Sequence, residues 1–215
     1  MITDKEKLRS KLIFASLFIM AYENFLSGWK DQVFYFYADA TIINGKLEYG
    51  FYDVVFADKN DINSFTYVKS YEKENEFYKK VYRLVKNQNG KGYSKELSLF
   101  KYLETRGIID NFDYLKLEEI RNLRNKLVHE LDNILYENDL GDSQELFKQL
   151  IKIRKKANEN WFREVEIPIA YEKFLDKDGN FAPPEVVISS QDLIFDIIIE
   201  TALNQLKKIV TLHFF

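Results

Sequence analysis

The chain has no cysteine and little proline or glycine, with 3 and 8 residues respectively among its 215. The absence of thiols excludes disulfides, thiolate nucleophiles, zinc ribbons and iron–sulfur clusters, and it fits a cytoplasmic protein. Because proline and glycine interrupt helices, their scarcity favours long helices. A chain of this length can bury one good hydrophobic core, so we expect a single domain over residues 1–215.

Long apolar runs and a large excess of one charge are also missing. The longest apolar run, Leu12 to Tyr22, has 11 residues and is followed by Glu23 and Asn24, whereas a membrane-spanning helix needs about 20. We therefore expect no membrane association. The formal net charge of −3 excludes a protein that coats nucleic acid over a large face, so any RNA contact must be local.

Apolar residues recur at helical spacing through most of the chain, which predicts an all-α fold. Thr3 and Glu6 form a capping box, and the first helix is expected to run from there to about Tyr37. Further helices are expected over residues 70–86, 94–105, 113–136 and 142–161, and from residue 189 or 190 towards the C-terminus.

Two segments, residues 40–68 and 164–188, lose the helical period and are expected to be irregular or β-hairpin insertions. In the first, Asn44-Gly45 stands between two short β-like runs and predicts a hairpin turn. The second contains all three prolines. It also contains Asp176 to Asn180, which begins like an EF-hand calcium loop but lacks the glycine and glutamate required further on. We interpret that stretch as a turn and expect no metal site.

The chain has 2 histidines, so chemistry that needs an imidazole near neutral pH must use His129 or His213. His213 lies close to the C-terminus, where a frayed or packing role is expected. His129 shares one face of its predicted helix with Arg121 and Asn125, at i, i+4 and i+8, and Arg124 stands beside that row. The ordinary interpretation of such a row is a solvated face, with the leucines at positions 123, 127 and 131 packing on the opposite side.

The segment Leu123-Arg124-Asn125-Lys126-Leu127-Val128-His129 resembles the signature of the HEPN superfamily, in which an arginine precedes a histidine by four to six residues. In that family a polar residue such as asparagine often follows the arginine. The order of the predicted helices between Leu8 and Trp161 is also similar to that of the HEPN bundle. The resemblance implies an all-α, HEPN-like up-and-down helical bundle and a ribonuclease of the toxin or abortive-infection type.

The resemblance further implies RNA cleavage without metal or cofactor, by attack of a ribose 2′-hydroxyl on the adjacent phosphate. In this scheme His129 moves protons, Arg124 holds the phosphate oxygens, and Asn125 orients the substrate or the imidazole. The reaction needs two proton transfers, and each chain has one credible imidazole. Because HEPN ribonucleases typically dimerise, we expect a homodimer with a composite site.

Four further cations are candidate RNA contacts: Arg121, Lys126, Lys152 and Lys155. Arg121 can alternatively hold a salt bridge with Glu118 or another acid. Lys152 and Lys155 belong to a run of five cations, from residue 148 to 156, that contains no acid. Such a run can track an RNA backbone, and it is otherwise a solvated helix face.

Glu23 and Asn24 interrupt the apolar first helix, and polar groups buried there need partners. We expect Glu23 to support the site by reaching the helix that carries the motif. The alternative is that both residues face solvent or cap a local network.

Two other functions stay open beside the ribonuclease. One is a HEPN-like module that binds RNA or a protein without cleaving, and the other is an unrelated helical scaffold in which His129 caps or packs. An antitoxin protein is a further partner that the resemblance implies. Control by a nucleotidyltransferase antitoxin is not expected, because Leu131 stands where some HEPN toxins carry the modified tyrosine.

Overall fold

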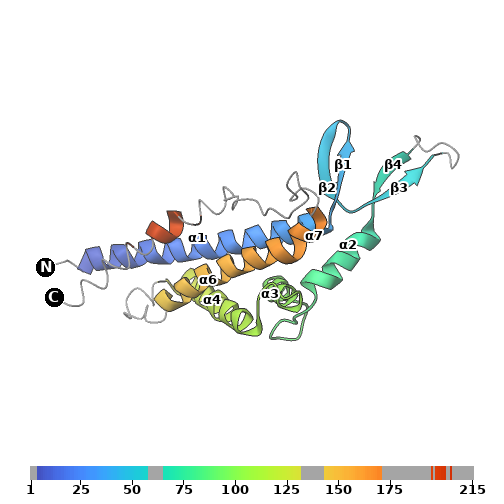
Figure 1. The fold of residues 1–215 in the computed structure, drawn as a ribbon. Coiled ribbons are helices and arrows are strands. Elements are labelled where there is room, and N and C mark those ends of the chain that lie inside the picture. Colours follow the sequence, from blue (N-terminus) through green and yellow to red (C-terminus); the bar gives the residue numbers. More distant parts are fainter. Residues whose placement is uncertain are drawn as a thin grey trace. The chain divides into compact units, whose positions relative to one another are not determined.

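The computed structural model describes residues 4–57, 65–131, 143–170, 195, 197–201 and 204 (Figure 1). The chain divides into two compact units. The first unit comprises Met1–Leu26 and Leu103–Phe215, and the second comprises Ser27–Tyr102. The protein is mainly helical, with a long N-terminal helix and two small antiparallel hairpins, which confirms the helical class expected. That residues 1–215 form one domain stays a prediction.

The N-terminal helix, α1, runs from Asp4 to Tyr37, as predicted. Its middle is buried along one side, where Phe14, Phe18, Tyr22 and Phe25 are almost inaccessible to solvent, whereas Met20 is 52% exposed. The part from Leu8 to Tyr37 is long and apolar enough to cross a membrane by length and composition alone. The buried core helix of a soluble protein meets the same criterion, so the expectation of no membrane association stays a prediction.

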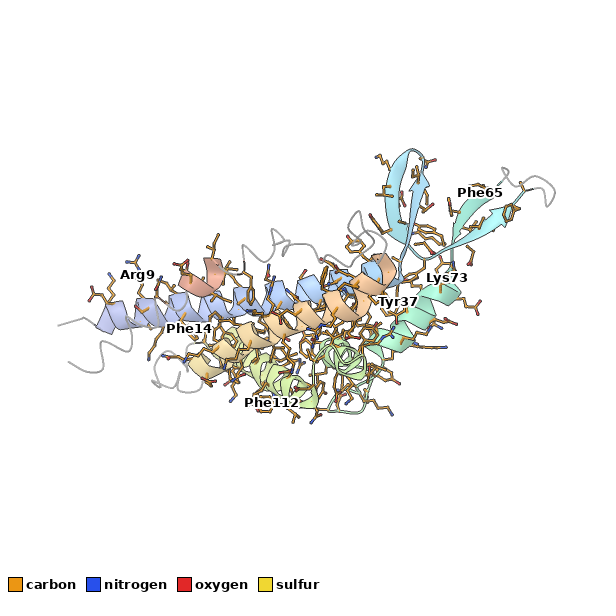
Figure 2. All side chains as sticks on the ribbon, in the orientation of Figure 1. Arg9, Phe14, Tyr37, Phe65, Lys73 and Phe112 are labelled. Atoms are coloured by element: carbon orange, nitrogen blue, oxygen red, sulfur yellow. The ribbon has the colours of Figure 1, made fainter. Side chains whose placement is uncertain are left out.

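In the first unit, α4 (Asn111–His129) packs against α6 (Ser143–Trp161). Phe147 of α6 completes an aromatic cluster with α1, with ring centroids 5.9 Å from Phe14 and 5.8 Å from Phe18. The Phe14 side chain is labelled in Figure 2. This cluster is the core of the first unit near the start of α6.

Both ends of α4 differ from the prediction. The helix begins earlier, because Asp110 is its N-cap and forms a capping box with Asp113. It ends at His129, with Glu130 as C-cap at φ −129° and ψ 26°, and Leu131 is helical again, whereas the apolar period predicted one continuous helix to residue 136. Val128 and His129 have lower helix propensity than the residues before them, which favours an end here. Residues 132–142 lie outside the described part of the chain.

The segment after α6 stays helical longer than expected. A π-helix, η2 (Phe162–Glu166), leads into α7 (Ile167–Ala170), so the prediction of an irregular segment is wrong for residues 164–170. Pro168 lies inside this continuous helical stretch, directly after the π-helix, so its missing N–H removes one hydrogen bond of the helix. The rest of that insertion, including Asp176 to Asn180, lies outside the described residues. Residues 195 and 197–201 are helical, but the predicted start of the last helix is not described.

The second unit contains both hairpins, and both fall in the first predicted insertion. Strands β1 (Asp39–Ile43) and β2 (Lys46–Gly50) pair through the predicted turn, in which Asn44 and Gly45 have φ of 52° and 74°. Strands β3 (Tyr52–Phe56) and β4 (Phe65–Lys69) form a second antiparallel pair. The sequence did not predict this pair, because Val54, Val55 and Phe56 are consecutive and do not alternate with polar residues.

Three short helical elements follow the hairpins: α2 (Tyr71–Phe77), the π-helix η1 (Tyr78–Tyr82) and α3 (Lys95–Thr105). The predicted helix to residue 86 ends at Tyr82, because the buried hydroxyl of Ser98 accepts hydrogen bonds from the N–H groups of Leu84 and Val85, at 3.2 and 3.0 Å. The predicted stop after α3 is confirmed by Gly107, whose φ is 71°.

Candidate active site on helix α4

The buried stripe of α4 determines where the motif side chains point. Leu117, Ile120 and Leu127 are fully buried, and Arg124 lies on the same stripe, four residues after Ile120 and three before Leu127. The prediction that Leu123 packs on the buried side together with Leu127 is therefore corrected: Leu123 is only half-buried, and Arg124 lies on the buried stripe. Periodicity alone did not reveal this, because a charged residue was not counted as part of a core.

Arg124 is fixed by residues on both sides of its guanidinium. Its Nη2 forms an ion pair with Oε1 of Glu23 on α1, and its Nη1 donates to Oδ1 of Asn125 at 3.0 Å. Its Cζ lies 5.9 Å from the ring centroid of Tyr22, within the range of a cation–π contact. Its Nε is buried and has no hydrogen-bond partner among the described residues. The side chains of Arg124 and Glu23 are 23% and 44% exposed, so the pair is partly shielded from solvent.

A second arginine reaches the next residue of α1. Arg154 of α6 is buried, and its Nη1 donates to Oδ1 of Asn24 at 2.7 Å. On its other side, the Cζ of Arg154 lies 3.9 Å from the ring centroid of Phe195. The two polar residues that interrupt α1 therefore each contact an arginine, one from α4 and one from α6. Glu23 does reach the motif helix, and its role in a reaction stays a prediction.

His129 is separate from this cluster. It is the last residue of α4, it is exposed, and it makes no hydrogen bond or ion pair with any residue that the structure describes. Five residues along an ideal helix place it about 140° from Arg124. The structure thus brings Glu23, Arg124 and Asn125 together and leaves His129 at the surface. Nothing in the described residues prevents this imidazole from meeting a substrate or a second chain.

No family model, curated protein or solved structure matches this chain.

The other predicted RNA contacts lie in two places. Lys126 is exposed in the last turn of α4, and Arg121 is half-buried one turn before Asn125 and has a contact of its own. Lys152 and Lys155 are exposed on α6. Lys155 is next to a residue that pairs with the N-terminus of α4, and the length of α4 from Asn111 places that end about 27 Å from His129. Lys155 is therefore distant from His129 in the same chain, and a contact of either lysine with RNA stays a prediction.

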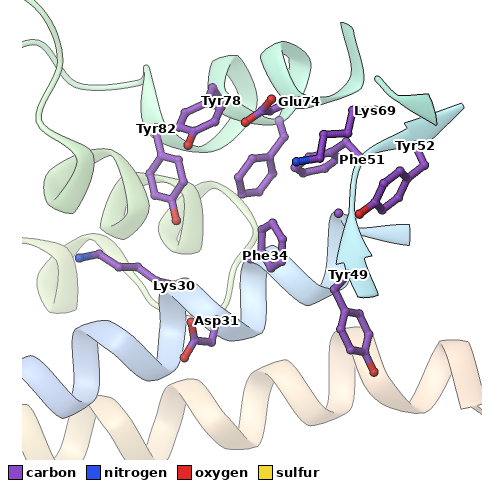
Figure 3. A pocket seen from close by; sticks show the side chains of 12 residues that line it. Lys30, Asp31, Phe34, Tyr49, Phe51, Tyr52, Lys69, Glu74, Tyr78 and Tyr82 are labelled. Atoms are coloured by element: carbon purple, nitrogen blue, oxygen red, sulfur yellow. The ribbon is translucent and has the colours of Figure 1, made fainter. Parts of the chain in front are cut away.

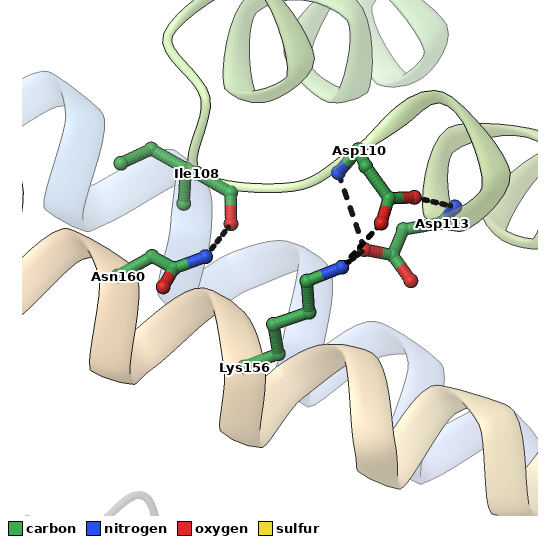
Figure 4. Close-up of polar contacts among 5 residues, drawn as sticks. All are labelled: Ile108, Asp110, Asp113, Lys156 and Asn160. Carbon is green, nitrogen blue, oxygen red and sulfur yellow. Dashed lines mark hydrogen bonds and ion pairs between the residues drawn. The ribbon is translucent and has the colours of Figure 1, made fainter.

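The five-cation run of α6 divides into structural and solvated residues. Arg154 is buried, and Lys156 binds both Asp110 and Asp113, at 2.5 and 2.6 Å (Figure 4). The Lys156 hydrogen bond, and then the Asp113 backbone bond, lower the pKa of Asp110, while the Asp110 and Asp113 bonds raise the pKa of Lys156. Beside them, Asn160 donates to the carbonyl of Ile108 at 2.9 Å. These contacts hold α6 against the start of α4, and the run is not a continuous RNA-binding stripe.

The sequence did not identify this lysine–aspartate cluster. The capping pair Asp110 and Asp113 was the available signal, but the position of Lys156 depends on the packing of α6. Within residues 4–57, 65–131 and 143–170, no three histidine or acidic side chains gather in a geometry that could hold a metal ion.

Proposed function

We propose that this protein is a metal-independent endoribonuclease of the HEPN type, with an up-and-down helical bundle. The observation that carries the proposal is the Arg-x4-His spacing at the end of α4. Its arginine is held by Glu23 and Asn125, and its histidine is exposed at the last helical residue. The contacts with Glu23 and Asn125 fix the position of Arg124, and the exposed His129 is accessible to RNA.

The proposed reaction is an internal transesterification of RNA. The ribose 2′-oxygen forms a bond to phosphorus, the bond from phosphorus to the 5′-oxygen breaks, and a 2′,3′-cyclic phosphate and a 5′-hydroxyl result. One imidazole accepts the 2′-hydroxyl proton, and one imidazolium donates a proton to the leaving 5′-oxygen. Arginine N–H groups stabilise the charge on the phosphate oxygens.

The site is composite in this proposal, because one His129 cannot serve both proton transfers at once. Arg124 points towards α1 and stands about 140° from His129 around the helix. A twofold dimer with two α4 helices across a cleft would supply a second His129 and a second Arg124. Lys126 and Arg121 of α4 would contact the flanking phosphates.

The physiological setting follows from the family resemblance alone. A toxin or antiviral-defence effector in the cytoplasm, controlled by an antitoxin protein, is the setting that the resemblance implies.

The test is RNA cleavage in EDTA by the purified protein, with His129→Ala and Arg124→Ala beside it. The proposal expects cleavage by the wild-type protein and its loss in both variants. Cleavage that persists in both would remove the mechanism. Mixing His129→Ala with wild-type chains tests the shared site, because an activity that falls only in proportion to the mutant fraction contradicts it.

A second function is favoured by one observation. Arg124 is largely shielded and faces away from His129, which suits a HEPN-like module that binds RNA or a protein without cleaving. RNA binding without cleavage by the wild-type protein would select this alternative.

A further inference from the structure

The second unit contains a cavity of about 370 Å³. Its walls come from the last turns of α1, from the region between the two hairpins, and from α2 and η1 (Figure 3). This volume lies in the range of cavities that hold small organic molecules, about 300–1,000 Å³.

The walls of the cavity are mainly aromatic rings, namely Phe34, Tyr49, Phe51, Tyr52, Phe77, Tyr78 and Tyr82. The rings hold one another in fixed orientations. Phe34 and Phe51 meet edge to face at 5.8 Å, and Phe51 and Phe77 are tilted at 5.1 Å. Aromatic walls of this kind favour a flat, aromatic ligand.

The charges at the cavity are balanced. Lys30, Lys69, Asp31 and Glu74 line it, which gives two positive and two negative side chains. Within the described part of the chain, these four side chains make no hydrogen bond or ion pair. Asp31 and Lys69 are exposed to solvent. A neutral ring with donors and acceptors on its edge matches both signs.

Tyr82 adds a hydroxyl to this set. Burial, and then the neighbouring Tyr78 and Asp31, raise its pKa to about 12. Like any tyrosine hydroxyl it is protonated at neutral pH, so it can donate a hydrogen bond to a ligand acceptor.

A series of exposed rings continues from the cavity along one face of the β3–β4 hairpin. Tyr52 and Lys69 are directly opposite each other in the register, followed by Val54 opposite Tyr67 and Phe56 opposite Phe65. Since alternate strand residues share a face, these pairs lie on the same side. The ring centroids of Tyr52 and Tyr67 are 6.4 Å apart. Those of Tyr67 and Phe65 are 5.5 Å apart, and those of Phe65 and Phe56 are 6.3 Å apart.

These rings are available to a ligand. Phe56, Phe65 and Tyr67 are 48%, 43% and 38% exposed, and Phe65 is labelled on its hairpin in Figure 2. A small molecule in the cavity would leave them unused. A polymer with a flat ring on every unit would use them in sequence. The ring spacing exceeds the rise of about 3.4 Å per nucleotide in a duplex strand, so it suits an extended single strand.

From the neutral, ring-lined cavity and the rings beyond it, we propose that the second unit binds single-stranded RNA. The cavity holds one nucleobase, and Tyr67, Phe65 and Phe56 stack on the bases that follow. The choice of RNA among polymers of flat rings rests on the proposed function.

The experiment uses the full chain with His129→Ala, so that RNA stays intact. Calorimetric titration with adenosine, guanosine, cytidine and uridine, and with 8-nucleotide single strands of each base, measures both ligand forms. The proposal expects at least one nucleoside to bind, and its strand to bind at least tenfold more tightly.

Three variants separate the cavity from the exposed rings. Tyr67→Ala should weaken the strand about 5- to 150-fold, the loss that one stacked base accounts for, and leave the nucleoside unchanged. Glu74→Gln and Tyr82→Phe should each weaken both ligands. Tyr71→Ala is the control, because Tyr71 is 79% exposed in the same unit but lies neither in the cavity nor among the paired rings. Circular dichroism checks that each variant folds.

Three results would overturn the proposal: no binding of any strand, equal losses for Tyr67→Ala and Tyr71→Ala, or a nucleoside that binds as tightly as its strand. In the last case the cavity serves free heteroaromatic molecules. The proposed ribonuclease is judged separately. If wild-type cleavage is absent while strands bind, the ribonuclease fails and this inference stands; if cleavage occurs and strands do not bind, only this inference fails.

Discussion

The ion pair between Arg124 and Glu23 predicts a measurable coupling of α4 to α1. Glu23→Gln keeps the size of the side chain and removes its charge, and Arg124→Met keeps an unbranched apolar stem on the buried stripe. Each variant and the double variant would be unfolded in urea. The cycle of four free energies of unfolding isolates the pairwise interaction from other effects of each change.

The magnitude follows from how far the pair is shielded. Exposed ion pairs couple by about 0.2–1 kcal/mol, and removing one partner of a fully buried pair costs about 3–5 kcal/mol. With side chains 23% and 44% exposed, this pair lies between the two, so a coupling of about 1–2 kcal/mol is expected. Glu23→Gln should be the costlier single change, because it leaves a shielded guanidinium with Asn125 as its remaining hydrogen-bond partner. Arg124→Met also removes the unpartnered Nε.

A matched control is available on α6. Lys148 and Glu145 are 4.0 Å apart and 54% and 61% exposed, so Lys148→Met and Glu145→Gln should couple by no more than about 0.5 kcal/mol. A coupling below about 0.3 kcal/mol for Glu23 and Arg124, or one no larger than in the control, would refute the reasoning. Arg124 would then be free to bind phosphate without loss of stability.

Three further predictions concern stability. Asp110→Ala should lower the free energy of unfolding by about 1 kcal/mol at pH 7. Because Lys156 lowers the pKa of Asp110, this carboxylate stabilises the fold fully above its unfolded pKa of about 3.9. Its contribution is lost as pH falls further, so urea unfolding curves of the two proteins should converge below that pH, and a constant gap would contradict the assignment. Phe147→Ala should cost about 3–5 kcal/mol, because its ring is fully buried; a loss under 1 kcal/mol by thermal unfolding would mean that the aromatic cluster is not core. Gly45→Ala should cost about 1–2 kcal/mol, because Gly45 has a φ of 74°; an unchanged melting temperature would contradict the turn geometry.

Local signals in the sequence predicted the features that depend on neighbouring residues. The apolar period of α1, the Asn44-Gly45 turn and the stop at Gly107 each depend on the backbone preferences of a few adjacent residues. The prediction was wrong where distant contacts decide the structure. Ser98 accepts hydrogen bonds from the chain after η1 and so ends a helix whose own sequence favours continuation.

The candidate site shows the same limit. The spacing of Arg124 and His129 could be read from the sequence, and so could the unusual position of Glu23 in an apolar helix. The direction of Arg124 could not, because its ion-pair partner is 101 residues away. Likewise, the sequence did not predict the pairing of β3 with β4, and it is this register that places Phe56, Phe65 and Tyr67 on one exposed face.

The first unit is discontinuous in the chain, which affects how it folds during synthesis. The apolar half of α1 leaves the ribosome before its packing partner. Phe147, which packs on Phe14 and Phe18, lies 129 residues after Phe18 in the sequence. At about 5–20 residues per second, translation takes roughly 6–26 s to supply that partner. Throughout that interval the nascent helix exposes its aromatic face, while all residues of the second unit emerge before Phe147 is made. Newly synthesised chains are therefore a substrate for holding chaperones, and a stall in translation before residue 147 leaves an aggregation-prone product.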